Sequence, residues 1–244
     1  MAIAYVKQTP QGTLSGGDST TMSFGSLPSA GNFIVVGISN WDAGSTDQAL
    51  AVSDNQGNTY YEAITSDESG DAVASIWYAY NIGSPTGTFT VTINPAGTDD
   101  YLAACAAEFS GLTTTDPKDV TVKSIGTNTS PVCGPTATTN QADELVIAVV
   151  QVSASDPTVG LDVPATTGYT NIEVEQDSSG IQGLSMDYKI VSSTGTQSAA
   201  WGTLDATPSG GWAGVIATFK AAGGGGGGSD GPAAGFRSLL GVGK

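Results

Sequence analysis

Two stretches of the sequence decide the fold: NFIVVGI at residues 32–38 and ELVIAVV at residues 144–150. Apolar residues follow one another in both, without the polar alternation of a strand that has one face in water. Strands of this kind are central in a sheet and covered on both faces. The sequence therefore predicts that the two halves of the chain pack on one another, and the alanine-rich run at residues 103–107 would allow a close approach there.

The same two stretches belong to a repeat that runs through most of the chain. Phe33 aligns with Leu145 at an offset of 112 residues, and three further matches follow in the same order. These join residues 57–60 to 168–171 (offset 111), 75–78 to 185–188 (offset 110) and 102–110 to 212–220 (offset 110). Because chance similarity between strands would not keep one register, we interpret the body as two copies of one unit of about 110 residues, the size of a single sandwich domain.

Seven short strands are expected in each copy, separated by turn sequences such as DNQG at residues 54–57. In the first copy they are expected at residues 2–7, 20–24, 33–41, 59–65, 74–81, 88–94 and 102–109, and in the second at 119–123, 135–139, 145–153, 169–175, 184–191, 197–201 and 213–219. The predicted fold is all-β, with two similar antiparallel β-sandwich halves, jelly-roll-like, at residues 1–113 and 114–222. The alternative is one continuous large sandwich with internal pseudo-symmetry.

Composition excludes several classes of partner. Charged residues make up 12% of the chain, and 7 cations against 23 anions give a net charge of −16. A phosphate backbone or an anionic membrane needs lysine and arginine, so we expect neither nucleic acid nor membrane as a partner. No stretch is long and apolar enough to span a bilayer. Residues 1–7 lack the features of a signal peptide, so we expect a chain that folds in the cytoplasm or one whose leader has been replaced by Met.

The sequence offers little for catalysis. It contains no histidine, which excludes Ser-His and Cys-His machinery and most zinc sites. A glycosidase needs only two carboxylates, for which Glu108 or the pair Glu173 and Glu175 can be considered. We interpret all three as structural or surface residues and predict no enzyme, no catalytic residue and no cofactor.

Three further groups carry open alternatives. Two acidic clusters can be considered as calcium loops, but neither matches an EF-hand and no metal site is predicted; they are Asp42, Asp47 and Asp54, and Asp67, Glu68 and Asp71. Six aromatic residues can be considered as a sugar-stacking platform, although aromatic residues in sandwich strands are mostly part of the core. They are Trp41, Tyr60, Tyr61, Trp77, Tyr78 and Tyr80. Whether Cys105 and Cys133 pair cannot be read from the sequence.

The chain ends differently from its body. Residues 223–230 form a linker dominated by glycine, which predicts a flexible coil. Residues 231–244 are apolar and carry Arg237, the only arginine, whereas disordered tails are usually polar. We expect a docking peptide in which Phe236, Leu239 and Leu240 share one face of a short helix. The alternative is a disordered end or a remnant of a longer chain.

Three segments carry a resemblance: residues 52–60 (VSDNQGNTY), 75–79 (SIWYA) and 108–112 (EFSGL). Together they resemble a β-sandwich module found in bacterial surface proteins and in phage structural proteins, and the resemblance spans residues 1–222. Separately, GFRSLLG at residues 235–241 resembles the short tails that end many phage virion-associated proteins.

The resemblance implies a virion structural protein, such as a capsid decoration protein, head fibre or tail-associated protein. Such a protein is made in the host cytoplasm and acts by protein–protein contact, with virion proteins or copies of itself as partners, as a homo-oligomer. The alternative is a carbohydrate-binding or adhesive module on a bacterial cell surface, with glycans as partners.

Overall fold

The structure is a computed structural model that describes residues 2–15, 19–41, 50–66, 72–95, 101–153, 168–176, 182–204 and 207–223. The first half contains β1 (Ala4–Gln8), β2 (Gly12–Ser15), β3 (Thr20–Ser23), β4 (Phe33–Trp41), β5 (Ala51–Asp54), β6 (Tyr61–Thr65), β7 (Ala72–Ala79), β8 (Thr90–Asn94) and β9 (Tyr101–Ser110). The second contains β10 (Lys118–Gly126), β11 (Val132–Cys133), β12 (Asp143–Ser153), β13 (Thr170–Gln176), β14 (Gln182–Ser192), β15 (Ala199–Ala200) and β16 (Trp212–Lys220). The described residues contain no helix, so the predicted all-β class is confirmed.

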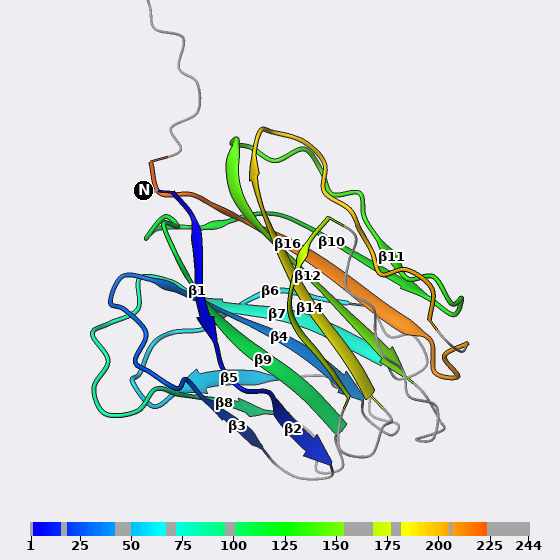
Figure 1. Ribbon diagram of the computed structural model, residues 1–244, viewed down its shortest axis with the longest axis horizontal. Helices are drawn as coiled ribbons and strands as arrows, with labels where there is room; N and C mark the ends of the chain where they lie inside the picture. Colours follow the sequence, from blue (N-terminus) through cyan, green and yellow to red (C-terminus); the bar gives the residue numbers. More distant parts are fainter. Residues whose placement is uncertain are drawn as a thin grey trace, which may run out of the picture.

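The strands form four antiparallel sheets. In the first half, a large sheet has the order β1-β9-β4-β7-β6, with β2 also paired to β9, and a small sheet has the order β3-β8-β5. In the second half, the large sheet has the order β10-β16-β12-β14-β13 and the small sheet consists of β11 and β15. Figure 1 shows the sheets stacked, with the first small sheet at the bottom, the two large sheets above it and β11 at the upper right. Each large sheet is therefore an inner layer.

The two large sheets share not only strand order but also register. Phe33 lies opposite Phe109 in the first sheet, and Leu145 lies opposite Phe219 in the second. On the neighbouring strand, Tyr78 lies opposite Val35 and Tyr188 lies opposite Ile147. The offsets of 112 and 110 residues predicted from the sequence therefore connect positions that have the same partners.

One strand departs from these offsets. Tyr61 of β6 lies opposite Tyr78, and Thr170 of β13 lies opposite Tyr188, so these edge strands correspond at an offset of 109 rather than 111. The glycines Gly57 and Gly168, which are 111 apart, both have a positive φ, at 78° and 81°. The connection from Gly168 to its strand is two residues shorter, which explains why the strand and its turn follow different offsets.

The central strands are buried on both faces, as their unbroken apolar runs predict. On β4, Phe33 and Val35 face a core between the two large sheets, whereas Ile34 and Val36 face a core between the large and small sheets of the first half. Strand β12 divides in the same way: its odd-numbered residues 145–149 face the shared core, and its even-numbered residues 146–152 face the small sheet of the second half.

The shared core contains matching contacts across the two large sheets. The rings of Tyr78 and Phe219 lie 5.1 Å apart, and those of Phe109 and Tyr188 lie 5.2 Å apart. At Gly37 the sheets approach closely, because an added Cβ atom would lie 2.8 Å from Met186 Sδ and 3.0 Å from Val149 Cγ2. A glycine is therefore required at this point of contact unless its neighbours move.

Several predicted strands need correction. Strands β2 and β5 were not predicted, and residues 135–139 are not a strand. Pro135 has no N–H to donate, and the Thr136 hydroxyl, not its carbonyl, accepts a hydrogen bond from the Gln197 backbone N at 2.9 Å. The side chain thus replaces a backbone acceptor of the ladder. The predicted strand at residues 197–201 is correspondingly reduced to Ala199–Ala200.

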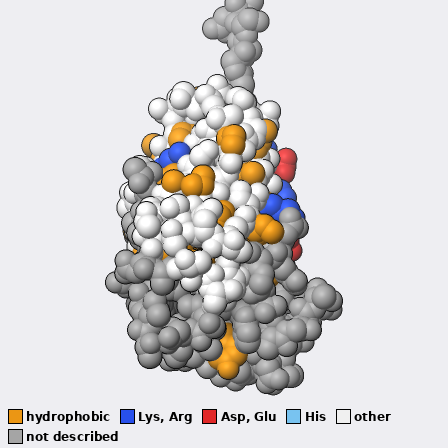
Figure 2. All heavy atoms as spheres, turned by 90° about the vertical axis from the view of Figure 1, so that its right-hand side faces the viewer, with side chains coloured by type: hydrophobic (Ala, Val, Ile, Leu, Met, Phe, Trp, Pro, Cys, Tyr) orange, Lys and Arg blue, Asp and Glu red, His pale blue; other side chains and the backbone are white. Residues whose placement is uncertain are grey.

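The described surface is low in charge. On the described part of the face in Figure 2, small separate groups of hydrophobic side chains and a few charged ones lie among backbone and other side chains. Large apolar side chains that are exposed include Tyr5, Val6, Leu27, Tyr61, Ile125, Val132 and Ile190. Two of these, Tyr5 and Ile190, lie where the two halves meet.

Candidate functional site

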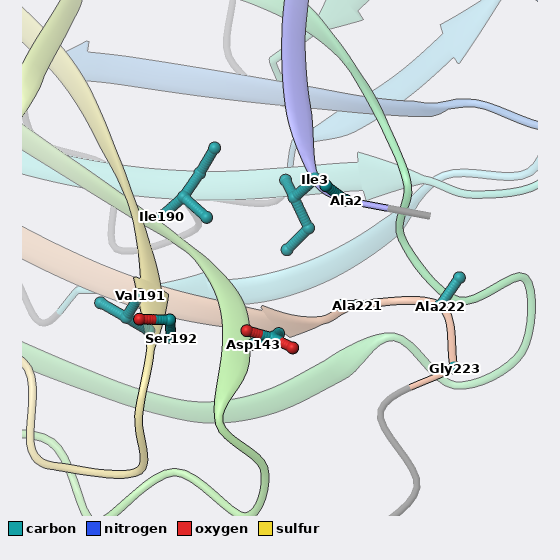
Figure 3. A pocket seen from close by; sticks show the side chains of 9 residues that line it. All are labelled: Ala2, Ile3, Asp143, Ile190, Val191, Ser192, Ala221, Ala222 and Gly223. Carbon is teal, nitrogen blue, oxygen red and sulfur yellow. The ribbon is translucent and has the colours of Figure 1, made fainter.

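A pocket of about 470 Å³ lies at the junction of the two halves. We call it the junction pocket; it is lined by Ala2, Ile3, Asp143, Ile190, Val191, Ser192, Ala221, Ala222 and Gly223. Figure 3 shows these residues coming from the start of β1, the start of β12, the end of β14 and the segment after β16. Residues near both ends of the described chain therefore meet in one recess, and its volume is in the range of small-ligand sites, about 300–1,000 Å³.

The walls of the junction pocket combine apolar and polar surface in nearly equal parts. Ile3 is buried, whereas Ile190 is 46% exposed although it lies on a long strand of the large sheet. Beside them, the ring of Tyr5 stacks on that of Tyr188 with centroids 5.5 Å apart, which joins β1 to β14 across the junction. Tyr5 on β1 therefore lies against Tyr188 on β14, and Ile3, just before β1, lines the pocket together with Ile190.

Asp143 is the charged residue of the lining. Its backbone is held firmly, since the carbonyl accepts hydrogen bonds from the Ala221 N at 3.0 Å and from Gln141 Nε2 at 2.6 Å. Within the described part of the chain, no residue donates a hydrogen bond to its carboxylate or forms an ion pair with it. The junction pocket thus combines a mixed apolar and polar lining with one negative charge at a fixed position.

A second acidic group, Glu108, lies on β9 and is fully buried. Its Oε1 accepts hydrogen bonds from the Ser29 N at 2.7 Å and from Asn32 Nδ2 at 2.6 Å, and its Oε2 lies 3.3 Å from Lys7 Nζ. These contacts connect β1, β9 and the loop before β4. The Glu108 carboxylate is therefore surrounded by groups that hold the fold together, with no exposed surface of its own.

Glu144 is a functional candidate that sequence reasoning did not single out. It is buried at the start of β12, and neither carboxyl oxygen receives a hydrogen bond of good geometry from a described residue. Burial raises its pKa from the ordinary 4.5 to about 7; Asp119 adds to the rise and Thr218 opposes it. Burial also acts against ionisation of Asp119, but hydrogen bonds from Asn140 at 2.7 and 2.5 Å outweigh it, so the pKa of Asp119 is lowered. The arrangement suits a protonated Glu144 beside an ionised Asp119.

The other predicted acidic residues do not come together. Glu173 lies between the halves and accepts a hydrogen bond from Gln8 Nε2 at 3.0 Å, and burial raises its pKa. The side chain of Glu175 lies outside the described residues. Asp54 closes its own turn by accepting hydrogen bonds from the Gln56 and Asn58 backbone N atoms at 2.9 and 3.1 Å. The remaining calcium candidates, which also lie outside the described residues, are Asp42, Asp47, Asp67, Glu68 and Asp71.

No group of three or more potential metal ligands occurs in the described part of the chain. The aromatic candidates are also dispersed. Trp77 and Tyr78 point to opposite faces of β7, into two different cores, and Tyr60 packs beside Trp77. In contrast, Tyr61, Tyr78 and Tyr80 lie together with ring centroids 5.5–6.1 Å apart, and Tyr61 is the exposed member of this group. The side chain of Trp41 lies outside the described residues.

The cysteines and the tail complete the predicted candidates. Cys105 and Cys133 are free and buried, in different cores, so they do not pair. Burial raises the pKa of the Cys105 thiol to about 12 and that of Cys133 to about 11. The predicted docking residues Phe236, Arg237, Leu239 and Leu240, together with linker residues 224–230, lie outside the described residues.

Comparison with known proteins gives no relative from which a function could be transferred: no family model, no curated protein and no solved structure matches the chain. Over the ranges that the structure describes, no helix is long and apolar enough to cross a membrane.

Proposed function

We propose that the chain arose by duplication of one β-sandwich unit and that its two copies, residues 1–113 and 114–222, are fused face to face. The large sheets have equivalent strand orders and equivalent registers. The contact of Tyr78 with Phe219 is also repeated, at nearly the same distance, by that of Tyr188 with Phe109. Such reciprocal contacts are typical of a two-fold interface between identical units.

The duplicated body serves as a structural protein that acts by protein–protein contact. We assign it to the virion structural proteins, of the capsid decoration, head fibre or tail-associated type. The observation that carries this proposal is the junction pocket, because its mixed apolar and polar lining with a single carboxylate suits docking of a peptide segment. The resemblance of residues 235–241 to virion-associated tails supports the same function.

The buried charges support a structural role as well. Glu108 is engaged by three groups of the first half. Asp187 in the second half accepts hydrogen bonds from Trp201 Nε1 at 2.9 Å, Ser185 Oγ at 2.9 Å and Asn171 Nδ2 at 3.0 Å. Carboxylates consumed in this way stabilise the fold and are not available to a substrate.

Mass spectrometry of density-purified virus particles, made in cells that express the chain with and without residues 229–244, tests the proposal. The full chain should co-purify at a constant ratio to the major capsid protein and should remain bound through a salt wash. Absence from the particles, or a ratio that falls to that of soluble host proteins, would overturn the virion assignment.

The second candidate function is carbohydrate binding on a bacterial cell surface. It rests on the stacked pair of Tyr61 and Tyr80, since exposed aromatic faces are apolar surfaces on which sugar rings can stack. A glycan array probed with the full chain and with Tyr61→Ala tests it. Binding that is lost in Tyr61→Ala would favour this function, and an array without signal would eliminate it.

A further inference from the structure

The junction pocket lies at the point from which the C-terminal segment leaves the body. Gly223, the last described residue, is part of the pocket lining, and Ala221 and Ala222 precede it there. Phe236 follows Gly223 by 13 residues. A flexible chain of that length has an r.m.s. end-to-end distance of roughly 20 Å, so the peptide can reach a recess at its own tether without extending.

The chemistry of the pocket complements that of the peptide. Ile3 and Ile190 provide an apolar patch in this lining. Residues 236, 239 and 240 of the peptide are Phe, Leu and Leu, a spacing that places them on one face of a short helix. A peptide of this kind is too short to be a stable helix alone, and docking of one apolar face is what stabilises such segments.

The charges of the two surfaces also match. Asp143 contributes a carboxylate to the pocket, and within the described residues nothing neutralises it. Arg237 is the only arginine of a chain with a net charge of −16, and it lies beside Phe236 in the sequence. Arginine suits a carboxylate because its guanidinium can donate two parallel hydrogen bonds.

We propose that the junction pocket is the binding site of the chain's own C-terminal peptide, residues 231–244. Phe236, Leu239 and Leu240 pack on Ile3 and Ile190, while Arg237 pairs with Asp143. The short linker makes this event intramolecular, at an effective concentration in the millimolar range for a short flexible linker. The peptide of the same chain therefore occupies the pocket in preference to that of a second copy at ordinary protein concentrations.

An arginine-specific protease tests the proposal on the isolated full-length chain. The chain has a single arginine, so such a protease cuts only after Arg237 and releases residues 238–244. When docking is fast relative to cleavage, the cleavage rate follows the fraction of undocked peptide. Mass spectrometry of the time course gives that rate without any knowledge of a particle or partner.

Two exposed isoleucines provide a matched pair of variants. Ile190 in the pocket is 46% exposed and Ile125 on β10, outside the pocket lining, is 47% exposed, so a glutamate is tolerated by the fold at both. Cleavage after Arg237 should accelerate roughly fivefold to tenfold in Ile190→Glu, corresponding to a peptide that is docked for most of the time in the parent chain. Ile125→Glu should be cleaved at the parent rate.

Charge reversal gives a second, independent variant. Asp143→Lys should also accelerate cleavage, whereas Glu62→Lys, at an exposed position of β6, should not. Thermal unfolding checks that each variant is folded. In the parent chain, the methyl NMR signals of Ile3 and Ile190 should shift when residues 229–244 are deleted, and that of Ile125 should not.

Equal cleavage rates in the parent chain and in both pocket variants would overturn the proposal. Protection that grows with protein concentration, together with dimers in sedimentation, would also overturn it by showing that the peptide of a second copy fills the pocket. This inference rests on the proposed function, because both use the junction pocket as a peptide-binding site, but the two tests are separate. Equal cleavage rates would rule out docking of the chain's own peptide and leave the pocket open to a partner, whereas absence from particles would leave the cleavage result unchanged.

Discussion

Each half of the molecule buries a carboxyl group at its central strand pair, β9 and β4 in the first half and β16 and β12 in the second. The surroundings of the two carboxyl groups differ. In the first half Glu108 on β9 faces Lys7, with a hydrogen bond from Asn32. At the corresponding positions of the second half, Thr218 replaces Glu108 and Glu144 replaces Asn32, and the nearby charge is Asp119 rather than a lysine. The two positions thus differ: Glu108 is ion-paired, whereas burial and a neighbouring carboxylate raise the pKa of Glu144.

A second difference concerns the tryptophan of each outer core. In the first half Trp77 projects from β7, and its indole nitrogen is buried without a hydrogen-bond partner among the described residues. The corresponding residue of β14 is Asp187, which accepts a hydrogen bond from Trp201 of another segment. An indole ring therefore packs in both outer cores. In the second half it belongs to Trp201, which lies outside the large sheet, and Asp187 on β14 accepts its hydrogen bond.

Removal of Glu108 should have the largest effect. Glu108→Ala leaves Asn32 Nδ2 and the Ser29 N–H without an acceptor, and each unsatisfied buried donor costs about 1–3 kcal/mol. Lys7 loses its ion pair but keeps its hydrogen bonds to Ser26 and Leu27. Thr218→Val at the corresponding position removes one hydroxyl, which accepts from the Val120 N at 3.2 Å, and should cost about 1 kcal/mol. Urea denaturation measures both. Equal losses would show that the two halves do not differ at this position.

Gly37→Val tests the closest contact between the halves. Its side chain would overlap Met186 and Val149, so we expect a loss of about 1–3 kcal/mol, the usual cost of overpacking. Val149→Gly makes room on the opposite sheet, and the double variant should be more stable than the sum of the single changes predicts. Strict additivity in the denaturation curves would contradict the proposed face-to-face contact of these residues.

The raised pKa of Glu144 predicts a pH dependence of stability. A carboxyl whose pKa is raised to about 7 in the folded state stabilises the protein fully below its ordinary pKa of 4.5, and this contribution is lost as the pH rises through 7. Glu144→Gln should therefore gain roughly 1–2 kcal/mol over the parent chain at pH 8 and gain little at pH 5; this allows for screening of a group near the surface.

Thermal unfolding at both pH values measures that gain. The control is Glu62→Gln, at an exposed position, which should follow the parent chain at every pH. A Glu144→Gln variant that is less stable than the parent chain at pH 8 would mean that Glu144 is ionised and held by contacts like those of Glu108.

The smallest effect is expected at the exposed ion pair of the second half. Lys220 Nζ lies 3.4 Å from Asp116, nearly the separation of Lys7 and Glu108, but the Asp116 side chain is 90% exposed. Exposed pairs contribute about 0–1 kcal/mol. Asp116→Asn should therefore change stability by less than about 0.5 kcal/mol, and asparagine tolerates the positive φ of 44° there. A larger loss of stability would mean that the distance between the two charged groups decides the strength of the ion pair more than the burial of the carboxylate does.

The sequence was sufficient to predict the central strands. The apolar runs of β4 and β12 are long, and burial on both faces leaves a clear pattern. Short elements carried too little signal: β5 has four residues that end in a turn, and β11 has two. Residues 135–139 have strand-like composition, but Pro135 has no N–H to donate, and the Gln197 N–H is bound by the Thr136 hydroxyl instead of a backbone carbonyl. Regular strand pairing is therefore interrupted there.

The candidate site could not be predicted in the same way. The junction pocket combines residues from position 2 to position 223, and no local pattern indicates that they meet. Glu144 begins a predictable strand, but its raised pKa depends on burial and on Asp119, a residue 25 positions earlier in the chain. The apolar tail was noticeable from composition alone because it contrasts with an acidic body.

The two buried thiols have a consequence for where the protein can work. Cys105 and Cys133 form no disulfide, and a thiol must ionise before it can be oxidised or exchanged. Because burial raises the pKa of both thiols far above neutrality, they should remain reduced in an oxidising medium as well as in a reducing one. The body is therefore held together without a disulfide, in an oxidising medium as in a reducing one.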